Sequence, residues 1–219
     1  MKKFFVIIGV AAIFTGILCF AILREKSNAP LLYSENLDRV IVRTGEREFT
    51  LHDLAFYIGF QENKVNEQAL IYDPAHPSNW WNTHTNGKFL KTEALESAID
   101  MMLHDWYYSK DADAEGFALT EEEQRFVESA ASDYFWDLGE DGLKALGLTP
   151  EDVNGVCERI ALSEKRMDEL ARESGLDRAV YESGGKVWEE EKAALNPVID
   201  KDLLRRIPMG NITTVRRSD

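Results

Sequence analysis

The sequence predicts a mainly α-helical domain over residues 39–219, with a small two-stranded sheet, behind an N-terminal transmembrane helix. Three observations support this fold class. Apolar residues recur at three- and four-residue spacing along most of the domain, as they do in amphipathic helices. Only segments 39–43 and 197–199 are of β type, and they lie near opposite ends of the domain, so we expect them to pair. An uncharged apolar run at residues 4–23 is long enough to cross a bilayer as a helix.

The apolar run allows two interpretations, an uncleaved membrane anchor and a cleaved signal peptide. A signal peptide usually has a shorter apolar core and a small-residue cleavage site. The nearest candidate site, at residues 27–29, is weak. We therefore predict an anchor over residues 1–25 and a polar tether over 26–38, with secretion after cleavage as the alternative. The lysines before the run favour a single-pass protein whose body lies on the extracytoplasmic side.

The charge of the domain excludes some partners. All 39 acidic residues follow residue 23, against 23 basic residues, because only Lys2 and Lys3 precede it. Such an acidic surface disfavours nucleic acid and anionic lipid headgroups, although residues 4–23 would still contact the bilayer interior. Only Cys157 lies outside the anchor, and its place on an apolar helical face indicates a small core residue.

The first helix is predicted from Thr50, a capping residue that precedes Leu51-His52-Asp53. It carries apolar residues as far as Val65. Residues 66–90 then interrupt the pattern with turn chemistry such as Asp73-Pro74. Large aromatic residues are embedded in this insert. A long loop of this composition is expected either to pack on the body or to bind a partner.

The later helices have clear start signals. Residues 92–110 show helical periodicity, and Thr120 with Glu123 forms a capping box for the next helix, which Gly139 and Gly142 end. Thr149-Pro150 starts a third long helix, with proline at its first position and acidic residues in its first turn.

The C-terminal part is shorter and more broken. Gly184-Gly185 interrupts the chain, and residues 186–195 resume as a short helix before the strand at 197–199. Leu203, Leu204 and Ile207 predict a last short helix before Pro208.

Two helix starts, Leu119-Thr120-Glu121-Glu122-Glu123 and Gly147-Leu148-Thr149-Pro150-Glu151-Asp152, carry a resemblance to a known family. In this order, behind an export segment and a Val-rich strand, they resemble the N-terminal chaperone domain of SurA- and PrsA-type extracytoplasmic foldases. The match covers residues 39–174, with 197–200 as an extension. It implies a SurA-like helical domain whose ends are joined by a strand pair, and chaperone-like binding of non-native or exported polypeptides.

One departure from that family concerns catalysis. Complete foldases insert a parvulin-type prolyl isomerase domain, a unit of ~90 residues, before the last strand. Only residues 174–196 lie in that interval here, and they are too few. The resemblance therefore implies peptide binding without catalysis. Peptidyl-prolyl isomerase activity and an adaptor role with one dedicated protein partner remain alternative hypotheses.

Catalytic and metal-binding patterns are weak. The sequence contains no HExxH, phosphate loop or GxSxG motif. His104 and Asp105 are adjacent on a predicted helix, where neighbours point in different directions, so we do not expect them to form a catalytic pair. His76 and His84 share the insert, but zinc needs three or four convergent ligands. We therefore predict no catalytic residue, metal or cofactor.

The remaining candidate site is aromatic. The chain has more large rings than one helical core obviously needs, so we predict a groove for apolar segments of unfolded exported chains. The alternative is that these rings belong to the core. Acidic rims would keep such a groove soluble and favour basic clients. The predicted peptide-binding residues are Tyr72, Trp80, Trp81, Phe89, Tyr107 and Trp136.

Overall fold

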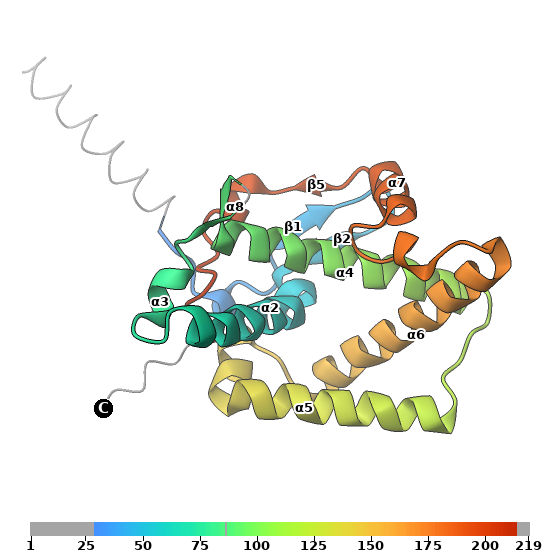
Figure 1. The fold of residues 1–219 in the computed structure, drawn as a ribbon, viewed down its shortest axis with the longest axis horizontal. Coiled ribbons are helices and arrows are strands. Elements are labelled where there is room, and N and C mark those ends of the chain that lie inside the picture. Colours follow the sequence, from blue (N-terminus) through green and yellow to red (C-terminus); the bar gives the residue numbers. More distant parts are fainter. Residues whose placement is uncertain (1–28, 86, 214–219) are drawn as a thin grey trace, which may run out of the picture.

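The computed structural model describes residues 29–85 and 87–213 of the chain. This part is mainly helical with a small antiparallel sheet, as the sequence predicts (Figure 1). The predicted anchor at residues 4–23 lies outside the described residues, and within them no helix is long and apolar enough to cross a bilayer. The helices are α2 (Leu51–Tyr72), α3 (Pro77–Trp80), α4 (Leu90–Ala114), α5 (Glu121–Leu146), α6 (Pro150–Ser174), α7 (Lys186–Leu195) and α8 (Lys201–Leu204), with 3₁₀ turns η1 (Tyr33–Glu35) and η2 (Arg178–Val180).

The two strands predicted near opposite ends of the domain do pair. They lie antiparallel, with Val42 opposite Ile199 and Arg43 opposite Val198. The main sheet nevertheless has three strands, in the order β2-β1-β5, where two were expected. The extra strand forms because a turn after β1 reverses the chain. In this turn the Thr44 hydroxyl accepts hydrogen bonds from the backbone N–H groups of Glu46 and Arg47. The strands are β1 (Val40–Arg43), β2 (Glu48–Thr50), β3 (His84–Thr85), β4 (Lys88–Phe89) and β5 (Val198–Ile199).

Three long helices start where the sequence predicts. Thr50, Thr120 and Thr149 each accept a hydrogen bond from the backbone N–H three residues later, and the acidic side chain there accepts one in return. These reciprocal bonds satisfy backbone donors that a helix start leaves without partners. The capping boxes therefore fix the first residues of α2, α5 and α6.

Two predicted helix ends were wrong. Helix α2 continues to Tyr72, so the first third of the aromatic insert is helical, and α3 with the β3–β4 hairpin forms the rest. The periodicity was lost because the last turn of α2 points its apolar residues at solvent. In α5 the backbone leaves helical geometry at Gly139, with φ 65°, as expected. Gly142, however, lies inside the short helical piece that follows.

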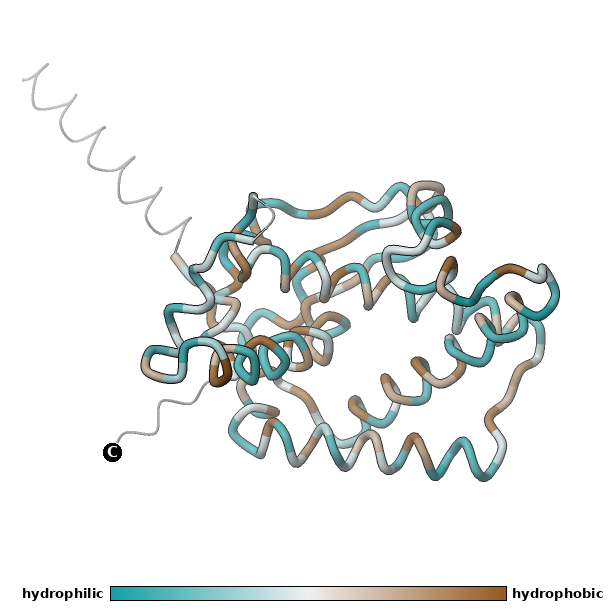
Figure 2. The backbone as a smooth tube through the Cα atoms, viewed as in Figure 1, coloured by the Kyte–Doolittle hydropathy of each residue, from teal (hydrophilic) through white to brown (hydrophobic). Residues whose placement is uncertain are grey.

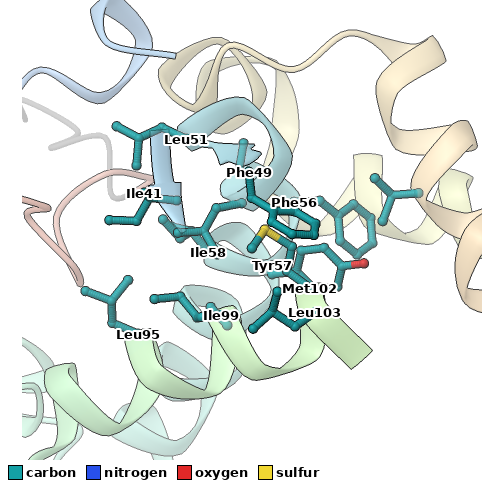
Figure 3. Close-up of a cluster of buried hydrophobic side chains, with 14 of the residues drawn as sticks. Ile41, Phe49, Leu51, Phe56, Tyr57, Ile58, Leu95, Ile99, Met102 and Leu103 are labelled. Atoms are coloured by element: carbon teal, nitrogen blue, oxygen red, sulfur yellow. The ribbon is translucent and has the colours of Figure 1, made fainter. Parts of the chain in front are cut away.

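The main core lies between the sheet and helices α2 and α4 (Figure 3). Phe49 of the sheet packs edge-on against Trp106 of α4, with ring centroids 5.1 Å apart. Helix α6 packs on α4, and α5 packs on both α6 and α2 along the side opposite the sheet (Figure 1). Apolar and polar residues alternate along α5 and α6 (Figure 2), and each helix buries part of its apolar residues, such as Val127 and Ala131 of α5 and Val153 of α6.

Candidate functional site

The six predicted aromatic residues do not share one surface. Trp81 is 5% exposed, and its indole N–H donates to Asn66 at 2.9 Å, so it belongs to the core. Tyr107 is half-buried beside Trp188, and its hydroxyl donates to Glu191 at 2.6 Å. For these two rings the core interpretation holds, because neighbours far along the chain cover them.

The other four rings lie in three separate places, where Tyr72, Phe89 and Trp136 are exposed and Trp80 is half-buried. Tyr72 and Trp80 stack on each other, with centroids 5.3 Å apart, where the end of α2 meets α3. Phe89 packs on His84 in the β3–β4 hairpin. Trp136 is 88% exposed on α5. The structure therefore brings together only the Tyr72–Trp80 pair of the predicted set.

A hollow at the junction of four helices is the better candidate site. It has a volume of about 480 Å³ and is lined by residues of α2, α4, α5 and α6, together with Glu182 and Ser183. A second hollow of about 350 Å³ lies beside it between α5 and α6. The two share Ala130, Cys157, Ile160 and Glu164, so they form one continuous depression, which we call the α5–α6 groove.

The floor and walls of the groove are mostly apolar. Phe56 and Phe60 of α2, Met101 of α4 and Met167 of α6 line its deeper half. Phe60 is 41% exposed, so apolar surface remains open to solvent. Flexible thioethers beside aromatic rings let one surface accommodate apolar groups of different shapes.

Residue spacing on α5 explains how one helix forms a wall of the groove. Lining residues Ala130, Asp133, Tyr134 and Asp137 recur at three and four residues, so they share one helical face. Tyr134 holds this face against α2, because its ring stacks on Phe56 with centroids 4.2 Å apart and its hydroxyl donates to the Phe56 carbonyl. Gly59 makes the approach possible, since any Cβ there would collide with the Tyr134 hydroxyl.

The rim of the groove is acidic. The carboxylates of Glu164, Asp168 and Glu182 all form ion pairs with the single guanidinium of Arg178. Glu123 at the far end pairs with Lys165 at 2.8 Å. That Lys165 hydrogen bond, with the bonds from Thr120, lowers the pKa of Glu123 to about 2.

Asp133 and Asp137 are the exception on this rim. Both line the groove from α5 and are exposed. Neither forms an ion pair or hydrogen bond with any residue that the structure describes. The deeper half of the groove therefore presents two uncompensated negative charges.

The expectation that the side chains of His104 and Asp105 point in different directions was wrong. Both are buried beside the groove floor, and His104 Nδ1 lies 2.9 Å from the Asp105 carboxylate. His104 Nε2 lies 3.0 Å from the Tyr181 carbonyl oxygen, which can only accept, so Nε2 carries a hydrogen. A second hydrogen must then lie between Nδ1 and the carboxylate.

The nucleophilic groups near the groove are poorly suited to catalysis. Burial raises the pKa of the Cys157 thiol to about 11, so little reactive thiolate exists at neutral pH. Burial also raises the pKa of the Tyr134 hydroxyl well above its ordinary value. The groove geometry therefore suits binding of apolar groups.

Sequence reasoning missed the groove for an identifiable reason. Its walls are ordinary amphipathic helix faces, and the predicted site instead followed the conspicuous tryptophans. One signal was present: Phe126, Ala130 and Tyr134 form a stripe at spacing four, and Asp133 and Asp137 flank it at the same spacing.

No group of three or more His, Cys, Asp or Glu side chains within residues 29–85 and 87–213 is arranged to hold a metal ion. Comparison of the chain with protein-family models, with curated proteins and with solved structures finds no match.

Proposed function

We propose that this chain binds apolar segments of non-native or exported polypeptides in the α5–α6 groove and holds them without catalysis, as a chaperone-like protein. The observation that carries this proposal is the groove itself, a solvent-accessible hollow between four helices that is lined by Phe, Met and Ile side chains of α2, α4 and α6. Exposed apolar depressions of this kind typically mark binding sites on soluble domains.

The order of elements supports the same class of function. A long helical segment whose two ends are joined by β1 and β5 is the arrangement that the resemblance to SurA- and PrsA-type chaperone domains implies. Between α6 and β5 the chain forms only η2 and α7, so no parvulin-type domain fits there. This favours binding without catalysis over the prolyl isomerase hypothesis.

The proposed place of action is the extracytoplasmic face of a membrane. The uncharged apolar run at residues 4–23 supports a single-pass anchor, and the lysines before it support an exported body. Anchoring would hold the groove close to polypeptides that emerge from the membrane.

The proposal is tested by aggregation of a chemically unfolded protein, followed by light scattering. The full chain in lipid nanodiscs, at near-stoichiometric ratio, is expected to suppress aggregation relative to empty nanodiscs. Ala130→Gln places a longer side chain at an exposed position inside the groove and should reduce suppression. Ser132→Gln makes a matched change on an exposed position of α5 outside the groove and should not.

Two further variants separate the groove from the surfaces predicted from sequence. Loss of suppression in Tyr72→Ala/Trp80→Ala or in Trp136→Ala, with Ala130→Gln unaffected, would move the binding surface to those rings. A well-folded chain that suppresses nothing would rule out general chaperone activity. The adaptor hypothesis would then gain support from one stoichiometric partner in a pull-down.

A further inference from the structure

We propose that the α5–α6 groove selects polypeptide segments in which apolar residues are flanked by lysine or arginine, with Asp133 and Asp137 as the recognition residues. This inference rests on the proposed function and adds the chemical class of the ligand. It starts from the difference between paired and unpaired charges around the groove.

The carboxylates around Arg178 and Lys165 each have a basic partner within the protein, although Glu164, Asp168 and Glu182 share the one guanidinium of Arg178. Arg178 pairs with Glu182 at 2.6 Å and with Asp168 at 2.7 Å, and Lys165 pairs with Glu123. No lysine or arginine lines the deeper hollow, where His104 is already bonded to Asp105 and to the Tyr181 carbonyl. Asp133 and Asp137 lie on its rim without partners among the described residues. An occupant of this hollow therefore meets apolar walls and two free carboxylates.

The spacing of the two carboxylates fits a polypeptide ligand. Four residues on a helix rise about 6 Å, so Asp133 and Asp137 present negative charges one helical turn apart along the rim. Basic side chains two residues apart on an extended segment, or four apart on a helix, have a similar separation. The lining residues of α5 span positions 123 to 137, a length of about 21 Å, which holds about six extended residues.

Charge also argues against other occupants. The chain has a formal net charge of −14, so a second copy would bring like charge to an acidic rim. Nucleic acids and anionic lipid headgroups are excluded on the same ground. A cationic, partly apolar segment is the occupant that complements both the floor and the rim.

The test measures binding of three fluorescent peptides by fluorescence polarisation to the full chain in nanodiscs, with empty nanodiscs as a blank. All three share a central block of leucine and phenylalanine, and their flanks carry lysines, glutamines or glutamates. We expect the lysine-flanked peptide to bind about ten-fold tighter than the glutamine-flanked one at low salt, and the glutamate-flanked one to bind weakest. High salt should reduce the difference.

Asp133→Asn/Asp137→Asn should bring the lysine-flanked peptide close to the affinity of the glutamine-flanked one, with the latter unchanged. Glu128→Gln/Glu140→Gln is the matched control, because it removes two charges from exposed positions of α5 outside the groove. The inference is overturned if the three peptides bind with equal affinity. It is also overturned if the two double variants change the affinities alike, because the preference would then come from the overall negative charge of the protein. If no peptide binds at all, the proposed function itself fails.

Discussion

The His104–Asp105 pair is a buried polar contact beside the groove. His104 packs edge-on against Tyr108 and Trp188, with centroids about 5 Å from each, so its ring cannot turn toward water. Its two nitrogens are fixed between Asp105 and the Tyr181 carbonyl. The pair therefore joins α4 to the segment after η2 and supports one wall of the groove.

Replacing Asp105 tests this contact. Asp105→Leu should lower the free energy of unfolding by about 1–3 kcal/mol, because it leaves a buried imidazole nitrogen without a partner. Asp105→Asn should retain most of the stability, since its amide can donate to Nδ1 of neutral His104. Urea unfolding of both variants measures the difference. Equal losses would show that the pair is not formed in solution.

Buried tyrosines set the alkaline limit of stability. Burial is the main cause that raises the pKa values of Tyr33, Tyr57 and Tyr134 well above 10. Up to about pH 10 the contribution of these neutral tyrosines to the free energy of unfolding is fully present. Above it the unfolded chain releases protons that the folded chain retains, so the free energy of unfolding falls as pH rises.

Tyr134→Phe should therefore make the decrease in the free energy of unfolding above pH 10 shallower, by up to about 1.4 kcal/mol per pH unit. Urea unfolding between pH 7 and pH 11 gives the slope for both proteins. Between pH 7 and pH 9 the two curves should run parallel, because the loss of the hydrogen bond to Phe56 only offsets them. An unchanged slope above pH 10 would mean that Tyr134 is accessible to water.

At the scale of elements, α5 is held to α6 at its first turn. Lys165 of α6 donates to the Ala118 carbonyl at 2.9 Å and to Glu123 at 2.8 Å. Glu123 also accepts from the Thr120 backbone N–H, so one carboxylate serves both the helix cap and the contact between helices. This end of the groove is fixed by side chains, while its apolar walls remain open.

The titration of Glu123 reports on this contact. The pKa of Glu123 is lowered from 4.5 to about 2, and the largest cause is the Lys165 hydrogen bond. Lys165→Met should therefore raise this pKa, which carboxyl ¹³C NMR measures. Because the folded pKa is lowered, the stabilising effect is present above pH 4.5 and is lost as pH falls toward 2. Lys186→Met, at an exposed position of α7, is the control and should leave the Glu123 titration unchanged.

At the scale of the whole molecule, the two ends of the described chain are tied to each other and to the core. Leu31 donates to the Arg206 carbonyl at 2.9 Å, and Arg206 donates back to Ala29 at 3.0 Å. The C-terminal segment then reaches Glu62 of α2, whose fully buried carboxylate accepts from the backbone N–H groups of Gly210, Ile212 and Thr213. The C-terminal segment is therefore docked on α2 through one buried carboxylate.

Deleting residues 210–219 should lower the free energy of unfolding by about 3–5 kcal/mol, because the Glu62 carboxylate stays buried without its donors. Adding Glu62→Gln to the truncated chain should recover part of the loss, since a neutral amide costs less to bury. Thermal unfolding followed by circular dichroism measures both. Truncation without loss would show that the C-terminal segment is not docked in solution.

The sequence by itself determined the helical class, the starts of α2, α5 and α6, and the pairing of the two terminal strands. Helix starts are predictable because Thr50, Thr120 and Thr149 bond only to residues three positions away. The strand pairing followed because few β segments compete for partners. Tertiary structure alone decided which rings are exposed, since Trp81 is covered by Asn66 and by Gly210 of the C-terminal segment. It also created the α5–α6 groove, whose existence depends on how far two helices with ordinary faces splay apart over α2 and α4.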